Sequence, residues 1–492
     1  MKFTEHTLLA PLPEDLQRLK GYGDFPVMER VIQRKLNKEL PRHLRERLLA
    51  ELEIIRRLPV QYPYSWETAL KMMTENICAF TRKEFQELWE EDAMEWIYVQ
   101  GNVHFHVHFF SNLIKTREGL RCRLLDPEQG EDTRENSEFL NKTIALMKEQ
   151  GGISRRFSIK TVLHLNEEAQ RPGERIRVYL PIPVEYAQVK QVRLLHAQVV
   201  FASGEQKDVP VFRIRSGDEP EKREEEGSSF IAWIAPEDAG QRTVCFCGEY
   251  QKGMSFQIEY TYQVEMPWFD LKYPQKSLRK GLALQDEVNR PNHYLSEELP
   301  HVRFTPYLKA LAEEIVDGEN DALRKAKKIY DYITTHLMYS FVREYFCITD
   351  LVHYTACGWK GDCGLQALLF ITLCRISGVP ARWQSGLYTR PGHVGCHDWA
   401  MFYIEEYGWL FADCSFGGSA ARMGCEERRE FYFGNLDPYR MPSCSQFQAD
   451  FLPPVKGMRI DPYDNQLGEV EYADGCLRAG EFETVHELTA VE

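Results

Sequence analysis

The 492-residue sequence lacks an excess of positive charge. It carries 60 lysine and arginine residues against 74 aspartate and glutamate residues, which gives a formal net charge of −14. Nucleic acids and anionic membrane surfaces both bind basic patches, so this balance argues against either as a partner. We interpret the acidic surplus as a solubility feature.

Long hydrophobic runs are also missing. The first residues, MKFTEHTLLAPLPEDLQRLKGYGDF, contain no apolar stretch of the kind that a secretory signal needs. Nowhere does the chain approach the ~18 consecutive apolar residues of a membrane-spanning helix. These absences predict a cytoplasmic protein without membrane contact.

Paired cysteine motifs are absent as well. The thirteen cysteines are scattered and form no CxxC pair, which argues against a structural zinc knuckle. An odd, dispersed set is typical of free thiols in a reducing compartment. We expect no cofactor and no metal requirement.

What the sequence does contain predicts an α+β multidomain protein. Leu44, Leu48, Leu52 and Ile55 share one helix face, and Pro41 suits the first position of that helix. By contrast, the segment SFQIEYTYQV alternates apolar and polar residues, as a half-buried antiparallel strand does. Several such strands predict a β-sandwich, with the charged run SGDEPEKREEEGSS as a solvated loop. The predicted parts are a mostly helical region (1–150), a β-sandwich-like domain (153–265), a linker (266–299), an α+β core (300–460) and a C-terminal tail (461–492).

The run IYVQGNVHFHVHFF, residues 97–110, has the alternation of a strand. It would place His104, His106 and His108 on one face, a spacing that can bind zinc or copper. No acidic or cysteine partner is near in sequence, so we favour three surface histidines over a metal site.

A helix with a cysteine at its start is the strongest local signal. In GDCGLQALLFITLCRISGVPAR, residues 361–382, leucines recur at helical spacing, and Gly378 and Pro380 end the pattern. Cys363 therefore lies in the first turn, where free N–H groups and the helix dipole favour a thiolate. We expect a lowered thiol pKa, against the alternative of a small buried hydrophobe.

A base and an orienting group follow on two predicted strands. His397 opens HDWAMFYI and Asp413 ends WLFAD, with a hairpin turn near residues 405–408 between them. Because 397 + 413 is close to 405 + 406, the two residues should lie nearly opposite each other on antiparallel strands. Cys363, His397 and Asp413 thus form a workable thiolate–imidazolium triad.

Residues 300 to about 420 resemble the transglutaminase-like superfamily, a branch of the papain-like thiol enzymes. The resemblance rests on HVRFTPYLKALAEEI, KIYDYITTHLMYS, the cysteine helix ending in GVPAR, and HDWAMFYIEEYGWLFADCSFG, in the family's order. The preceding β-rich region resembles the domain that often stands before this core in bacterial members. The resemblance implies a papain-like fold for the core, with Cys363 as nucleophile, His397 as base and Asp413 as orienting group. No calcium loop is recognisable, so calcium dependence is not implied.

The resemblance implies acyl transfer on amide bonds of a peptide or protein substrate. We expect hydrolysis, and leave open amine transfer, as in a protein-glutamine transglutaminase, and a non-catalytic binding module. The oligomeric state is also left open.

Several neighbours are weaker candidates for the site. Trp359 could wall an acyl site or donate its indole N–H to an oxyanion, although packing is favoured, and the backbone N–H of Cys363 is a better donor. His393 is set aside because glycines flank it, and Asp398 because neighbours on a strand face opposite ways. The other nearby cysteines, Cys357, Cys374, Cys396 and Cys414, are interpreted as packing or surface residues.

Overall fold

A computed structural model of the chain describes the backbone of residues 5–126, 128–215, 230–271 and 291–492. It leaves out the side chains of residues 5, 6, 128–134 and 291. The charged run at residues 216–229 and most of the predicted linker lie outside the described residues.

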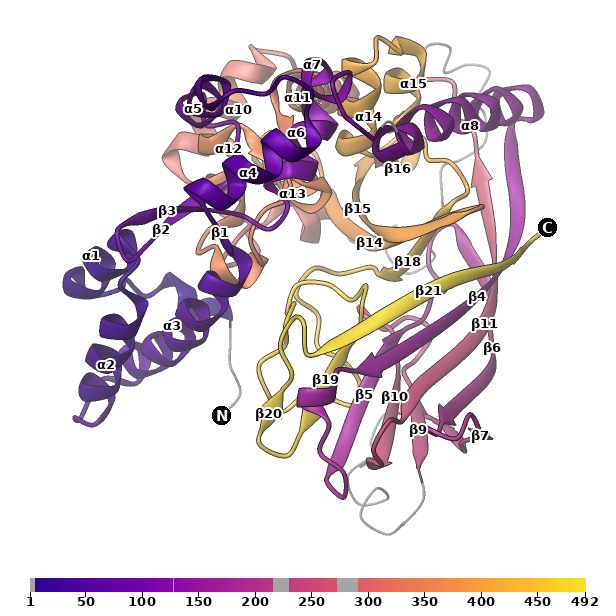
Figure 1. Cartoon of the computed structure of the whole chain (residues 1–492). Coiled ribbons are helices and arrows are strands. Elements are labelled where there is room, and N and C mark those ends of the chain that lie inside the picture. Colours follow the sequence, from indigo (N-terminus) through magenta and orange to yellow (C-terminus); the bar gives the residue numbers. More distant parts are fainter. Residues whose placement is uncertain (1–4, 127, 216–229, 272–290) are drawn as a thin grey trace.

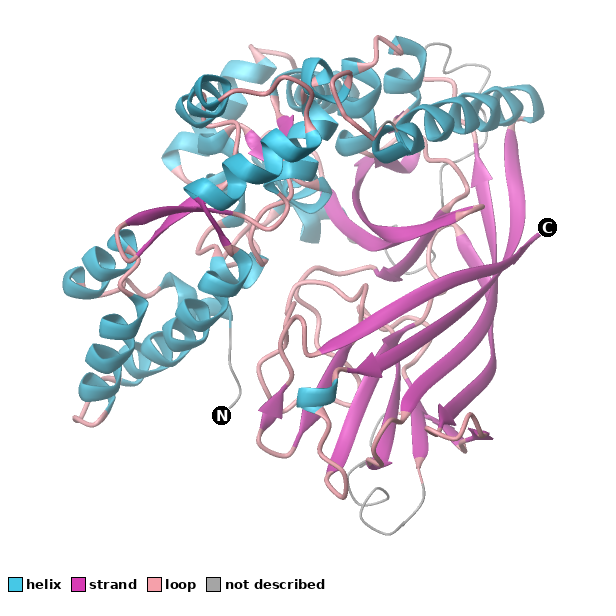
Figure 2. Cartoon of the chain, in the orientation of Figure 1, coloured by secondary structure: helices cyan, strands magenta, loops and turns pink. Residues whose placement is uncertain are grey.

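The first 150 residues are mostly helical, as the sequence predicts (Figures 1 and 2). In α3 the apolar face packs inward, with Leu48 and Ile55 buried. Pro41 is the residue that caps α3, one place before the first helical position. The elements are η1 (Glu5–Leu9), α1 (Glu14–Tyr22), α2 (Phe25–Leu36), α3 (Arg42–Gln61), α4 (Trp66–Asn76), α5 (Arg82–Glu90), α6 (Phe109–Thr116), α7 (Glu118–Arg121) and α8 (Glu128–Gln150).

A small sheet interrupts these helices, with the order β1 (Tyr64–Ser65), β3 (Asn102–Phe105), β2 (Trp96–Val99). The prediction of one strand over 97–110 is wrong. Gln100 and Gly101 adopt left-handed φ angles of 51° and 76°, which is the geometry of a tight hairpin turn. Beyond Phe105 the chain leaves the sheet and enters α6 after His108.

Two antiparallel-rich sheets form the predicted β-sandwich. The alternating segment at residues 255–264 lies in the long central strand β11, which pairs with β4 and β6 on either side. One sheet has the order β21-β4-β11-β6-β7 and the other β20-β19-β5-β10-β9-β8. The strands of the middle region are β4 (Gly152–Leu165), β5 (Arg175–Pro181), β6 (Val189–Val200), β7 (Gln206–Asp208), β8 (Val211–Arg213), β9 (Ile231–Ile234), β10 (Thr243–Glu249) and β11 (Ser255–Pro267), with η2 (Glu167–Ala169) after β4.

The end of the chain is part of this sandwich, so the prediction of a C-terminal tail over 461–492 is wrong. Strand β19 (Glu469–Tyr472) pairs with β5 and with β20 (Gly475–Cys476), and β21 (Phe482–Val491) pairs with β4. Figure 1 shows β21 running alongside β4. Without these strands, β4 and β5 would each present an unpaired row of N–H and C=O groups at a sheet edge.

The α+β core follows the predicted order of elements. Thr305 caps its first helix by accepting from the Leu308 amide, as its sequence predicts. A five-stranded sheet has the order β17-β16-β15-β14-β18. The helices are η4 (Pro291–Leu295), α10 (Pro306–Val316), α11 (Ala322–His336), η5 (Tyr345–Cys347), α12 (Leu351–Gly358), α13 (Cys363–Ile376), α14 (Cys414–Arg422) and α15 (Glu426–Phe431). The strands are β12 (Met338–Tyr339), β13 (Lys360–Gly361), β14 (Ala381–Arg390), β15 (His393–Ile404), β16 (Gly408–Ala412), β17 (Phe433–Gly434) and β18 (Arg440–Cys444).

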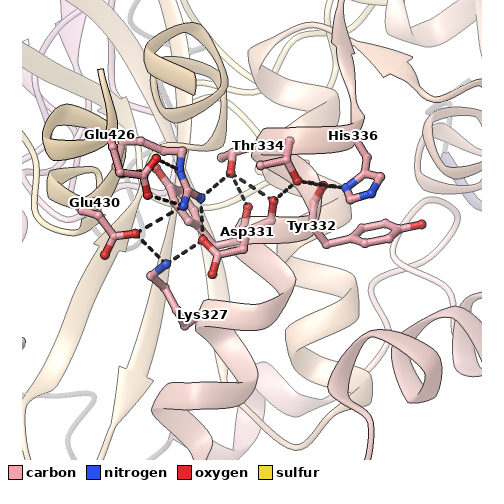
Figure 3. Close-up of polar contacts among 10 residues, drawn as sticks. Lys327, Asp331, Tyr332, Thr334, His336, Glu426 and Glu430 are labelled. Carbon is pink, nitrogen blue, oxygen red and sulfur yellow. Dashed lines mark hydrogen bonds and ion pairs between the residues drawn. The ribbon is translucent and has the colours of Figure 1, made fainter. Parts of the chain in front are cut away.

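An ion-pair network joins α11 to α15 (Figure 3). Lys327 Nζ lies 2.6 Å from Asp331 Oδ1 and 2.8 Å from Glu430 Oε1. Arg429 bridges Asp331 and Glu426. Such a network with shared partners fixes the last turns of α11, which lead directly into β12 beside the cysteine helix.

The N-terminal helices are bonded to the core. The Asn112 amide donates to Ser340 Oγ and to the Phe341 carbonyl, and its oxygen accepts from the Phe341 amide at 2.8 Å. Buried Arg57 forms an ion pair with Glu344 at 2.8 Å. The first 150 residues therefore help to hold the segment that contains β12 and η5. No helix among the described residues is long and apolar enough to cross a membrane.

Candidate active site

Cys363 is the first residue of α13, at the position that its sequence predicts. Asp362 caps the helix by accepting a hydrogen bond from the Leu365 amide at 3.2 Å. The Tyr345 hydroxyl donates to the same carboxylate oxygen. The half-buried thiol is thus held at the helix start by a cap that has a second partner of its own.

The thiol contacts Asp398 on β15. Its S–H donates to Asp398 Oδ2 at 3.2 Å, while the Gln466 amide donates to Oδ1 at 2.6 Å. Burial and neighbouring carboxyl groups raise the pKa of Asp398 to about 7. Burial, followed by the charges of Asp398 and Asp362, also raises the pKa of the Cys363 thiol. The expected lowering of the thiol pKa is therefore wrong for this geometry, because burial and, after it, two nearby carboxyl groups disfavour the thiolate.

His397 and Asp413 are brought together as the hairpin arithmetic predicts. His397 Nε2 lies 2.8 Å from Asp413 Oδ2, and both side chains are buried. The register of β15 with β16 pairs Ala400 with Ala412, so partner numbers sum to 812. Asp413, which follows the last residue of β16 and caps α14, is consequently offset by two places from the point opposite His397.

Arg440 anchors the far side of Asp413. The guanidinium donates to Asp413 Oδ2 at 2.9 Å and to Asp437 Oδ1 at 3.1 Å, and none of these three side chains is exposed. Burial alone would raise the pKa of Asp413. The charge and hydrogen bond of His397, with the charge of Arg440, outweigh it and hold that pKa below its ordinary value. Asp413 is therefore an ionised, fixed acceptor for the imidazole.

The structure brings together two of the three predicted catalytic groups. With Nε2 bonded to Asp413, Nδ1 is the nitrogen of His397 that can accept a proton from a thiol. Among the described residues, however, no hydrogen bond joins Cys363 to His397. Neighbours on a strand point to opposite faces, and Asp398 faces α13 while His397 faces Asp413.

The indole of Trp359 contacts the end of α11. Its ring lies 5.5 Å from that of Tyr332 and 6.4 Å from that of His336, and 38% of the residue is exposed. These contacts agree with a packing role. A part in an oxyanion site stays a prediction.

The three histidines of the 97–110 run do not share a strand face. His106 is buried against Tyr62, while His108 caps α6 and Val107 is exposed. Burial lowers the pKa of His106 to about 4, so this ring is neutral at physiological pH. No group of three or more His, Cys, Asp or Glu side chains in the described part of the chain could hold a metal ion.

The competing residues take the following places. Cys374 and Cys414 are buried, and Cys357 is exposed with its sulfur 3.4 Å from His353 Nε2. His393 begins β15 and is exposed, whereas His397 is buried.

A cavity of about 600 Å³ opens beside His397. Tyr339 lines it as well, and this residue pairs with Gly361 of β13, two residues before Cys363. The cavity therefore adjoins both the imidazole and the surroundings of the thiol.

Residues 309–414 match the family model of the transglutaminase-like superfamily, so the chain contains a transglutaminase-like core at these residues. A candidate cysteine protease from Cytophaga hutchinsonii is similar over 69% of this chain and 89% of its own, with 12% identity and a TM-score of 0.36. The periplasmic domain of TgpA from Pseudomonas aeruginosa is similar over 60% of this chain and 96% of its own, with 13% identity and a TM-score of 0.27. Scores this low carry no argument about activity or location. No curated protein matches the chain.

Sequence reasoning missed the residues that surround the triad. Arg440, Tyr345 and Gln466 reach the site from β18, η5 and the loop before β19. No local motif marks them. The alternation of side chains along a strand could have indicated Asp398. Because His397 faces Asp413, its neighbour Asp398 must face the opposite side of the sheet, where the cysteine helix lies.

Proposed function

We propose that the chain catalyses thiol-dependent acyl transfer on amide bonds, with hydrolysis of a peptide or protein substrate as the reaction. The observation that carries this proposal is the buried His397–Asp413 pair on a strand whose next residue, Asp398, contacts the thiol at the start of α13. A free thiol, a base and an orienting carboxylate are the three groups that such chemistry needs.

The proposed reaction proceeds in two steps. His397 Nδ1 takes the thiol proton, and the sulfur of Cys363 bonds to the amide carbonyl carbon. The C–N bond then breaks, the Nδ1 proton passes to the departing amine, and a thioester remains. Water adds to the thioester with His397 as base, which releases the acid and restores the thiol.

Asp398 sets the condition for the first step. The thiol must come within hydrogen-bond reach of His397, so its bond to Asp398 must break first. In the described geometry the raised pKa of Cys363 favours the protonated thiol at physiological pH, while Asp398, with a pKa of about 7, is divided between its protonated and ionised forms. The proposal therefore treats this arrangement as a resting state of the thiol.

Product analysis tests the reaction. The full chain is incubated with a peptide library, with and without a primary amine, and the products are analysed by mass spectrometry. Free acids and new N-termini support hydrolysis, whereas isopeptide adducts would indicate a transglutaminase. Cys363→Ser should abolish either product, while Cys357→Ser, on the exposed cysteine of α12, should not. Absence of any Cys363-dependent product would favour a binding module.

We further propose a cytoplasmic location, in line with the composition. All thirteen cysteines are free thiols in the structure, which a reducing compartment maintains. Cell fractionation with trapping of free thiols checks this. Recovery with disulfides would contradict it.

A further inference from the structure

The cavity beside His397 is built jointly by the N-terminal helices and the core. Helices α6, α7 and α8 supply one wall, and β14, β15, α14 and α15 supply the other. Figure 1 places α8 alongside α14 and α15. The N-terminal helices thus line the cavity beside His397. The sequence did not predict this.

Its described lining is strongly cationic. Five basic side chains face a single carboxylate, Glu118, in a chain whose acidic residues outnumber its basic ones by 74 to 60. The five basic residues are Lys115, Arg121, Arg390, Arg422 and Arg428. A positively charged cavity raises the local concentration of anionic ligands.

Arg428 is the lining residue whose described partners include no carboxylate although it is buried, whereas Arg121 lies 3.9 Å from Glu118. Only 4% of the residue is exposed, and its guanidinium donates to the Ser137 carbonyl and hydroxyl, Asn141 Oδ1 and Met423 Sδ. All these acceptors are uncharged. A buried cation with neutral partners satisfies its hydrogen bonds but keeps its full charge, which an incoming anion can stabilise.

Arg422 is a second cation of the cavity, and unlike Arg428 it is exposed. It lines the cavity from the last turn of α14, and it has neither a hydrogen bond nor an ion pair with any described residue. An arginine side chain without a partner retains all its donors for a carboxylate.

Aromatic rings make up much of the remaining wall. Lys115 Nζ lies 4.0 Å from the ring centre of Phe341, so its ammonium is held over the ring at the edge of the cavity. Tyr339, Tyr388 and Phe416 add apolar surface close to His397. The combination suits an extended segment with apolar contacts and acidic side chains.

We propose, on the basis of the proposed function, that this cavity selects a substrate segment with glutamate or aspartate side chains next to the reacting amide. Arg422, Arg428 and Lys115 are the specificity residues. The preference is electrostatic, so it weakens with added salt.

The test compares matched peptides. Each pair differs by glutamate or glutamine at one position within four residues of the amide that the full chain cleaves. We expect kcat/KM to be at least about tenfold higher for the glutamate peptide at one or more positions, with a smaller ratio at about 0.5 M salt. A ratio near one at every position would overturn the proposal.

Variants locate the preference. Arg422→Gln and Lys115→Gln should each lower the glutamate-to-glutamine ratio by about three- to tenfold, and Arg422→Glu should shift the preference toward lysine peptides. Arg18→Gln, a change of the same charge on exposed α1, should leave the ratio unaltered. Thermal unfolding of each variant verifies that it is folded. Folded cavity variants with the ratio of the unaltered chain would contradict the assignment.

A binding arm separates this inference from the proposed function. If no peptide is turned over, the proposed function fails, and labelled glutamate and glutamine peptides are then titrated with the full chain by fluorescence anisotropy. At least about tenfold tighter binding of the glutamate peptide supports the cavity assignment. Equal binding overturns it.

Discussion

At the scale of single residues, Asp413 is the most constrained group of the site. It accepts from His397 and from Arg440 through the same oxygen, while its other oxygen caps α14 through the Phe416 amide. An asparagine at this position can still cap α14. It carries no negative charge, so it cannot accept charged hydrogen bonds from both His397 and Arg440. The role of Asp413 can therefore be separated from the general stability of the Arg440 cluster.

We expect Asp413→Asn to lower turnover by about 10² to 10⁴, because the imidazole loses the group that fixes its tautomer. Asp437→Asn is the matched control, since it also removes a carboxylate from Arg440 but does not touch His397. Steady-state kinetics and thermal unfolding are measured on both variants. Both should lose stability, and equal turnover in the two would remove Asp413 from the site.

The raised pKa of Asp398 makes the stability of the fold depend on pH in an unusual direction. Its pKa in the folded chain, about 7, lies above the ordinary value of 3.8. The stability that it contributes is complete below about pH 4 and is lost as the pH rises through 7. For one such proton the free energy of unfolding falls by about 1 kcal/mol per pH unit in that window.

Asp398→Asn should remove the part of this slope that Asp398 contributes and should lower the pKa of the Cys363 thiol, because a buried negative charge leaves its surroundings. The measurements are denaturant unfolding between pH 4 and 8 and the rate of iodoacetamide labelling against pH. Glu469→Gln is the control, since burial also raises the pKa of Glu469 to about 7 but this side chain bonds to backbone amides elsewhere. It should alter the stability slope alone. An unchanged labelling profile in Asp398→Asn would show that Asp398 does not control the thiol.

The sequence predicted the local part of the site and missed the distant part. The His397–Asp413 pair follows from one hairpin, whose register can be estimated by counting from the turn. Arg440 arrives on β18, which pairs with β14 through a long connection, and counting gives no register there. Asp398 was set aside correctly as a partner of His397, but its contact with Cys363 depends on how α13 packs on the sheet.

At the scale of elements, β14 joins the two halves of the site. Gly386 on this strand pairs with His397 on β15 and with Pro442 on β18, the strand that carries Arg440. A Cβ atom at Gly386 would lie 2.0 Å from the Met441 carbonyl oxygen. The close approach of β18, and with it the position of Arg440, therefore depends on the absence of a side chain at this residue.

We expect Gly386→Ala to lower the free energy of unfolding by at least about 1–3 kcal/mol and to lower turnover, because β18 must move away with Arg440. Gly21→Ala in helix α1 is the control, since nothing lies within 4 Å of its added Cβ. Alanine there should be neutral or slightly stabilising. Denaturant unfolding and kinetics measure both, and a Gly386→Ala chain as stable and active as the control would contradict this role.

Pattern reasoning succeeded for elements with a long regular period and failed at tight turns. Helices α10 and α11 and strand β11 were predicted because their apolar spacing extends over many residues. The 97–110 run also alternates, but two residues with left-handed φ angles fold it into a hairpin. His106 is buried although its side chain is polar. Alternation alone does not reveal where a strand turns.

At the scale of the whole molecule, segments far apart in the sequence contact each other. Its last strand, β21, lies beside β4, more than 300 residues earlier, and contacts near the start tie Arg57 and Asn112 to the core. The sequence alone suggests that the core from residue 296 onward could stand apart from the sandwich. In the structure that fragment carries β19 and β21 but neither β5 nor β4, their pairing partners.

We expect a fragment of residues 296–492 to remain unfolded or to aggregate, because two strands of the sandwich would expose unpaired edges and an apolar face. Co-expression with residues 1–271, which supply β4 and β5, should recover soluble protein that co-purifies as a complex. Val485→Thr in the full chain is the control, since it changes a half-exposed side chain of β21 and keeps the ladder, and it should alter stability by no more than about 0.5 kcal/mol. Circular dichroism and size-exclusion chromatography make the comparison. A soluble, cooperatively unfolding fragment on its own would mean that the core does not need the sandwich, and that β21 pairs with β4 without stabilising the site.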